Sequence, residues 1–272
     1  MKVWTLAVER LRGALKSKLL ILLLVISALF ALITTCFYGA QLTTEGGVVD
    51  PESQVFFARN VSFHLAAFWG MILSVFLGMT AVSGPIEDGR AAITLSKPTS
   101  RLEFVLGQTL GTLLTVAVSV SVLLLISWVL YTIRLKTFDF YIWIGFGVVL
   151  LGFLLAGAMV EAVGMFVPRL IAGMFGVVVY LASLPAAFPQ LHDIFKGTGN
   201  LMLANVPWYV RWAAEAYFAF VPPLGNIQLR AADLMNGASF LETEIWSGLL
   251  TGFIYVVVAL GVTWGVFIKR DL

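Results

Sequence analysis

Residues 83–101 read SGPIEDGRAAITLSKPTSR, a polar stretch that separates two long apolar runs. Gly84-Pro85 is a signal that stops the helix coming before it, and Pro98 limits any helix on the far side. Between these limits, acidic and basic side chains stand beside four apolar residues, Ile86, Ala91, Ile93 and Leu95. Small protein interfaces gain most of their energy from apolar anchors surrounded by polar groups. The stretch therefore predicts a short helix outside the membrane that binds another protein.

The composition excludes a soluble globule. Of 272 residues, 60% are hydrophobic and 12% are charged, and the mean hydropathy is +0.97, so the charges are too few to cover a soluble domain of this size. A span needs roughly 20 mainly apolar residues to cross about 30 Å of hydrocarbon. Six segments meet that length, at about 19–40, 61–83, 104–131, 141–167, 170–190 and 246–268. We predict one all-α transmembrane domain covering residues 1–272.

Basic residues set the expected orientation, because Lys and Arg beside short loops stay on the cytoplasmic side. Six spans place both termini on one side. With the N-terminus inside, the inner segments hold Lys2, Arg10, Arg12, Lys16, Lys18, Arg90, Lys97, Arg101, Arg169, Lys269 and Arg270. The outer segments hold Arg59, Arg134, Lys136, Lys196, Arg211 and Arg230. The excess on the inner side predicts a multi-pass protein of the plasma (inner) membrane with both termini in the cytoplasm.

Residues 2–18 have the pattern of a helix lying in the lipid headgroup region. Trp4, Val8, Leu11 and Leu15 recur at helical spacing, while the basic residues of this segment supply an opposite side. These charges would equally serve as a plain topology signal. The run of about 22 apolar residues that follows is longer than the core of a signal peptide, which favours a retained first span.

Three pairs of glycines at GxxxG spacing predict close helix packing. Gly107 and Gly111 lie in the third span, and the last span carries Gly248-x-x-x-Gly252 and Gly261-x-x-x-Gly265. Such faces let helix backbones approach each other, either within the chain or across a dimer.

Glu161 is the one carboxylate expected deep in a span, about 9 Å from its cytoplasmic end by helical rise. Such a residue must face protein or a water-filled cavity. Arg169, at the start of the next span, is a candidate partner. A structural pairing is favoured over proton coupling, which remains the alternative. His64 stands alone and is expected to pack or hydrogen-bond, and the single cysteine, Cys36, allows no disulfide within the chain.

The stretch 190–245 is the longest that does not span. Its segment 207–220 is rich in Trp and Tyr, which prefer the membrane interface. Pro222-Pro223 ends this segment, and residues 224–236 can form a second short helix. We expect one or two short helices that dip into the outer leaflet.

The order of these features resembles that of ABC-2-type transporter permeases. In the loop between the second and third spans, which we call the 2–3 loop, Glu87, Gly89, Pro98, Ser100 and Arg101 fit the family pattern. Leu106 and Gly107 fit it at the start of the third span. Arg90 and Ala91 depart from it, since Thr-Leu often stands there, and Gln108 replaces a common Lys. The ending FIKRDL, residues 267–272, is similar to the ending of many members. Permeases for nitrous-oxide-reductase maturation and for sodium or drug efflux look closest.

The resemblance implies a partner and a role. In that family the 2–3 loop is a coupling helix that docks into a separate P-loop ATPase. The ATPase-coupling residues carried over to this chain are Glu87, Asp88, Gly89, Arg90, Pro98 and Arg101. A second permease subunit, as a homodimer, and membrane lipid are the other expected partners. The alternative for the loop itself is an ordinary cytoplasmic connection with anchoring charges.

Several chemistries have no basis in the sequence. The chain has no Gly-x-x-x-x-Gly-Lys-Ser/Thr, so any ATP must be bound by a partner subunit. Two distant histidines and one cysteine predict no metal site, and no nucleophile stands at motif spacing from a base. We therefore expect a non-enzymatic subunit of an ATP-driven exporter, without a cofactor of its own and without a nucleic-acid partner. The alternative is an ATP-independent secondary transporter or channel.

Overall fold

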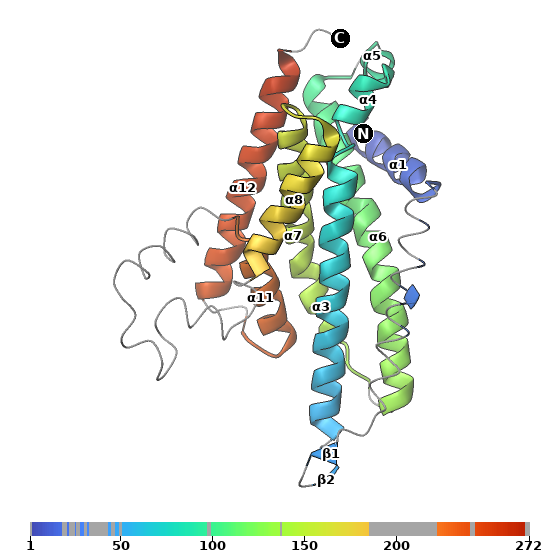
Figure 1. Ribbon diagram of the computed structural model, residues 1–272, viewed down its shortest axis with the longest axis vertical. Coiled ribbons are helices and arrows are strands. Elements are labelled where there is room, and N and C mark those ends of the chain that lie inside the picture. Colours follow the sequence, from blue (N-terminus) through green and yellow to red (C-terminus); the bar gives the residue numbers. More distant parts are fainter. Residues whose placement is uncertain are drawn as a thin grey trace, which may run out of the picture.

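The computed structural model describes residues 2–17, 43–44, 47–48, 51–96, 99–136, 138–184, 222–239 and 243–269, together with Ile21, Val25, Ala28, Leu29 and Leu32. These residues form a bundle of helices (Figure 1). Its helices are α1 (Lys2–Leu15), α3 (Pro51–Gly78), α4 (Ser83–Glu87), α5 (Arg90–Leu95), α6 (Arg101–Leu135), α7 (Tyr141–Gly164), α8 (Arg169–Ser183), α11 (Leu224–Met235) and α12 (Thr243–Ile268). Two strands of two residues each, β1 (Thr43–Thr44) and β2 (Gly47–Val48), pair antiparallel.

Four described helices are long and apolar enough to cross a membrane: α3, α6, α7 and α12. They correspond to the second, third, fourth and sixth predicted spans, so an all-α membrane protein is confirmed at that level. The fifth predicted span, 170–190, contains α8, a shorter apolar helix that ends at Ser183. Most of the first predicted span, 19–40, and the aromatic segment 207–220 lie outside the described residues.

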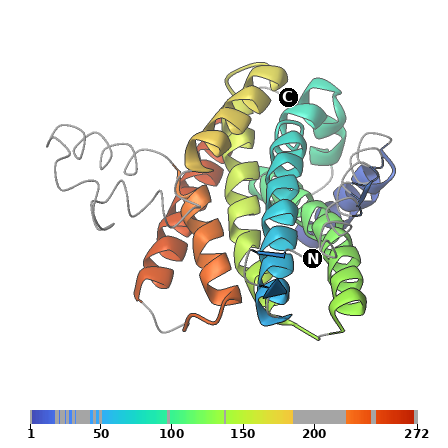
Figure 2. The ribbon, with the colours of Figure 1, turned by 60° about the horizontal axis from the view of Figure 1, so that its bottom comes forward.

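The helix α7 is the centre of the bundle, with α3, α6, α8, α11 and α12 packed around it (Figures 1 and 2). Its buried side includes many small residues, among them Gly152, Ala156 and Gly157, which allow neighbouring helices to approach closely. The second short helix predicted after the fifth span is present as α11. It packs against α7 and buries one side, with Leu224, Ile227 and Ala231 in the main apolar core.

The helix α3 begins at Pro51, before the predicted start at residue 61. Polar side chains in this added part of α3 find partners at this end of the bundle. The guanidinium of Arg59 donates to Asp139 at 2.8 Å and to Asn236 at 3.0 Å, and the side-chain amides of Asn60 and Asn236 bond to each other. Proline is also well suited to the first turn of a helix.

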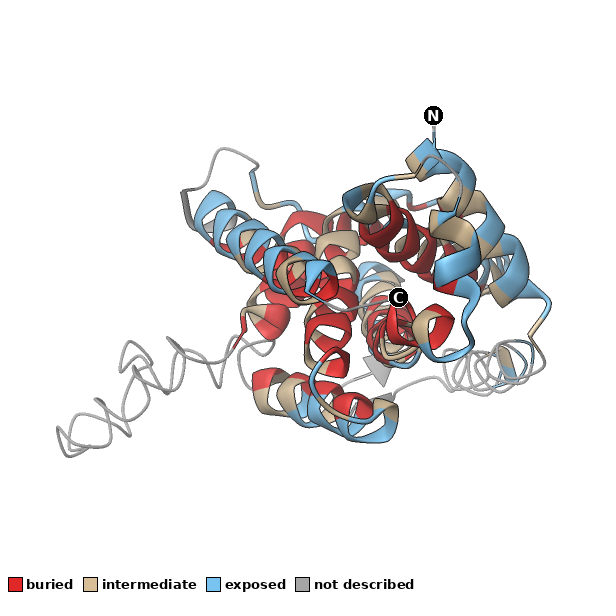
Figure 3. Ribbon diagram, turned by 90° about the horizontal axis from the view of Figure 1, so that it is seen from above, coloured by how far each residue is buried: buried red, intermediate tan, exposed pale blue. Residues whose placement is uncertain are grey.

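The opposite end of the bundle carries α1, α4, α5 and the last turn of α12, and we call it the α1 end (Figures 1 and 3). Here α1 lies across α6. A Cβ on Gly107 would come within 2.7 Å of the Leu6 Cβ, and one on Gly111 within 2.8 Å of the Ala7 carbonyl oxygen. The first GxxxG pair is therefore a packing face within the chain. Gly252 similarly faces Ile227 of α11 at 2.6 Å, whereas a Cβ on Gly261 or Gly265 would meet no atom of the described residues.

Candidate functional site

The polar stretch after α3 folds as two short helices, where the sequence predicts one. The helix α4 begins at Ser83, and Pro85 falls in its first turn, where proline is tolerated. Gly89 then joins α4 to α5 with a φ of +70°, a left-handed conformation that favours glycine. Ser100 starts α6 with a capping box, in which its hydroxyl accepts from the Glu103 N–H and the Glu103 carboxylate accepts from the Ser100 N–H.

Most of the predicted apolar anchors face the bundle. Ala91 is fully buried in a cluster with Val82, Phe104, Val105, Met165 and Phe267, and Ile86 and Leu95 pack against the same cluster. Ile93 differs, because 68% of it is exposed. The outer surface of this segment is thus formed by Glu87, Asp88, Arg90 and Ile93, which we call the α4–α5 patch.

The charges of the patch are paired locally and to α8. The Arg169 guanidinium lies 2.6 Å from a Glu87 carboxylate oxygen and 3.4 Å from the Gly84 carbonyl. Asp88 forms an ion pair with Arg90. The hydrogen bond from Arg90 is the main cause that lowers the pKa of Asp88. The prediction that Arg169 pairs with Glu161 is therefore wrong: at the start of α8, Arg169 turns to α4 instead.

Arg101 holds the start of α6 against the end of α12. Its Nη1 donates to the carbonyl oxygens of Phe267 at 2.8 Å and Ile268 at 2.7 Å, and its guanidinium carbon lies 5.7 Å from the Phe267 ring centroid. A cation at a helix C-terminus satisfies carbonyls left unpaired there and stabilises the negative end of the helix dipole. Among the coupling residues, Arg101 thus contacts the bundle, and Pro98 lies outside the described residues.

Glu161 of α7 is 3% exposed and is bonded to α6. The Thr109 hydroxyl lies 3.0 and 2.8 Å from its two carboxylate oxygens. The same hydroxyl lies 3.0 Å from the carbonyl of Val105. The favoured structural pairing thus has a candidate partner, Thr109, that the sequence did not suggest.

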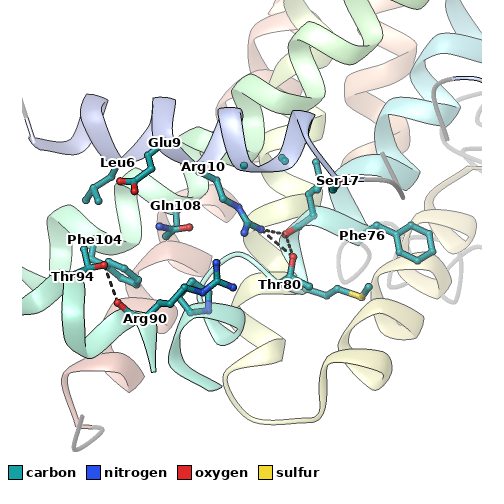
Figure 4. Close-up of a pocket in the computed structure, with 15 residues that line it drawn as sticks. Leu6, Glu9, Arg10, Ser17, Phe76, Thr80, Arg90, Thr94, Phe104 and Gln108 are labelled. Atoms are coloured by element: carbon teal, nitrogen blue, oxygen red, sulfur yellow. Dashed lines mark hydrogen bonds between the residues drawn. The ribbon is translucent and has the colours of Figure 1, made fainter. Parts of the chain in front are cut away.

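Arg10 is a functional candidate that the sequence pattern groups with the basic side of the predicted interfacial helix. Its Nη2 instead donates to the Leu77 carbonyl at 3.2 Å and to Thr80 Oγ1 at 3.0 Å, at the end of α3 (Figure 4). Burial lowers the pKa of Arg10, the nearby Glu161 opposes that shift, and the charge of Arg90 adds to it. The packed side of α1 runs through Leu6, Ala7 and Arg10. The glycine pair on α6 is the sequence signal that could have identified this side.

The predicted apolar stripe of α1 points away from the protein. Trp4 is 62% exposed and Leu15 is also exposed, while Val8 and Leu11 are half-buried. A helix with one side on the bundle and an aromatic, apolar side turned outward has the character of an interfacial helix.

Comparison with known proteins adds no assignment. No family model matches the chain, and no curated protein is similar to it. Within the described residues, no group of His, Cys, Asp and Glu side chains could hold a metal ion.

Proposed function

We propose that the chain is the membrane-spanning permease subunit of an ATP-driven exporter of the ABC-2 type. It works as a homodimer in the plasma membrane, with its α1 end in the cytoplasm and with ATP hydrolysed by separate P-loop ATPase subunits. The observation that carries this proposal is the α4–α5 patch, an exposed charged surface that is bonded to the bundle beneath it. A loop that only connected two spans would not need these ion-pair and packing contacts with the bundle.

The contacts of α4 and α5 with the bundle give a route by which ATP hydrolysis could be coupled to movement of the spans. A displacement of α4 and α5 acts on α8 through the Glu87–Arg169 ion pair. It also acts on α6 and α12, since Ala91 packs in the cluster that contains Phe104 and Phe267. The movement caused by closure of the ATPases would thereby be transmitted to helices on several sides of α7. The bound partner would thus move α6, α8 and α12 through α4 and α5.

Replacing Ile93 with glutamate tests the proposal. This side chain is exposed and makes no packing contact in the apolar cluster, so the fold is expected to survive. Loss of a central apolar anchor costs about 2 kcal/mol or more of binding energy, or about thirtyfold in affinity. The measurement is the amount of ATPase that co-purifies when the P-loop ATPase encoded beside this chain is co-expressed with it.

Ile133→Glu is the matched control. Ile133 is 71% exposed and lies on α6 at the end away from α1, so the same change there leaves ATPase binding intact. Ile93 is a better probe than Glu87, whose reversal would also break the ion pair with Arg169. Full ATPase stoichiometry in Ile93→Glu, or no ATPase encoded beside the chain, would contradict the proposal.

An ATP-independent transporter is the second candidate, and the buried Glu161 is the observation that favours it. Intramembrane carboxylates mark ion pathways in many transporters. In that case Ile93→Glu transports at the wild-type rate, whereas Glu161→Gln displaces the pH dependence of transport.

Topology is a separate expectation of the proposal. In a chain in which Cys36 is replaced by alanine, a cysteine at Ala92 of α5 is expected to resist a membrane-impermeant maleimide in intact cells. A cysteine at Phe138, between α6 and α7, is expected to react. The reverse pattern would show that the α1 end faces outward.

A further inference from the structure

A cavity of about 430 Å³ lies between α1, the end of α3, α4, α5 and α6 (Figure 4). Its lining combines charged, amide and apolar side chains: Arg10, Arg90, Gln108, Leu6, Phe76 and Phe104. It is larger than needed for one or two waters and falls in the size range of small-molecule sites. The functions proposed above do not use this cavity, although Arg90 in its wall also belongs to the α4–α5 patch.

Two guanidinium groups meet at this cavity. Arg10 comes from α1 and Arg90 from α5, and they are close enough for the charge of Arg90 to lower the pKa of Arg10 in addition to the larger effect of burial. The negative groups around them are Glu9 in the lining, Asp88 on Arg90 and Glu161 near Arg10. Two positive side chains on the wall of one cavity are stabilised by an anion placed between them.

Polar atoms in the cavity wall also lack partners. Among the described residues, Nε of Arg10 and Oε1 of Gln108 are buried without a hydrogen bond. Buried donors and acceptors normally find a partner in the protein, in water or in a ligand. The Gln108 amide can turn over without changing its shape, so it can present its NH₂ group to the cavity.

We propose that this cavity binds a phosphate group, supplied either by the head group of a membrane phospholipid or by a soluble phosphate compound. Guanidinium groups match phosphate in charge and in the geometry of their N–H donors. Phe76, an apolar residue of a membrane-length helix, lies at the edge of the cavity and is 37% exposed. This edge suits the glycerol and first acyl carbons of a lipid.

The experiment measures binding of phosphatidylglycerol to the delipidated full-length chain in detergent by native mass spectrometry. Arg90→Gln removes one cation. Gly13→Leu adds a bulky side chain to the cavity wall without changing any charge, and a Cβ on Gly13 meets no atom of the described residues within 4 Å. Each is expected to weaken binding about tenfold: Arg90→Gln because hydrogen bonds to charged groups are strong contributors, and Gly13→Leu because its side chain takes up room in the cavity. Arg12→Gln removes an exposed charge from α1 outside the cavity and is expected to bind like the wild type.

Adding inorganic phosphate distinguishes the two sources. If millimolar phosphate displaces phosphatidylglycerol, the ligand is a soluble phosphate compound. If phosphate leaves the binding of phosphatidylglycerol unchanged, the ligand is a lipid head group. Thermal unfolding of each variant verifies its fold. The proposal is overturned if Arg90→Gln and Gly13→Leu both bind phosphatidylglycerol and phosphate as the wild type does.

Discussion

Replacing Gly111 with leucine is expected to detach α1 from α6. A Cβ at this position would stand 2.6 Å from the Arg10 Cβ and 2.8 Å from the Ala7 carbonyl oxygen. Because the second contact is with backbone, no side-chain rotation relieves it. Overpacking of this kind costs about 1–3 kcal/mol, which raises the population of the detached state by about five- to 150-fold.

The measurement is maleimide labelling of a cysteine at Ala7, which is fully buried in the wild-type chain, in a background with Cys36 replaced by alanine. Labelling is expected to accelerate by the same factor in Gly111→Leu. Gly147→Leu is the matched control, since a Cβ there meets no atom of the described residues within 4 Å. Equal labelling rates in Gly111→Leu and in the control would show that α1 is held by other contacts.

The long apolar helices could be predicted because a membrane span consists of one continuous run of apolar residues. The helices α3, α6, α7 and α12 correspond to apolar runs that the sequence shows directly. Some of their ends, unlike the locally capped start of α6, depend on partners that are remote in sequence. The first turns of α3 are one example, because Arg59 is satisfied by Asp139, which lies 80 residues later.

The direction of side chains on the short helices was partly predictable. In α5, residues 91 and 95 are four apart and share one side of a helix, whereas residue 93 lies on the opposite side. That spacing already separates the inward Ala91 and Leu95 from the exposed Ile93. The prediction that Ala91, Ile93 and Leu95 all anchor a partner did not take into account that they lie on different sides of the helix.

The partners of Glu161 and Arg169 could not be predicted from proximity along the chain. Glu161 and Arg169 lie on consecutive helices, yet they face different neighbours. Glu161 meets α6 through Thr109, and Arg169 meets α4 through Glu87. The sequence correctly marked both residues as needing a partner, but the rotation of each helix decides which partner it finds.

Replacing Thr109 with valine is the second change expected to have a large effect. Valine keeps the shape of the side chain but removes the hydroxyl bonded to the Glu161 carboxyl group. A buried polar group left without its partner costs about 1–3 kcal/mol, and a charged one costs more. The free energy of unfolding in detergent is therefore expected to fall by at least about 1–3 kcal/mol. Thr115→Val is the control, because Thr115 is equally buried on α6 but bonds to the Gly111 carbonyl of its own helix.

The double variant Thr109→Val, Glu161→Leu separates a structural role for Glu161 from a bystander role. Removing both partners is far less costly than removing one, since no polar group then remains buried and unpaired. We therefore expect the double variant to regain most of the stability lost in Thr109→Val. If the losses of the two single variants add instead, the hydroxyl and the carboxyl are not coupled. Recovery would show that the hydrogen bond between Thr109 and Glu161 links α6 to α7, close to Arg10. A movement that the α4–α5 patch passes to α6 would then reach the central helix directly through this bond.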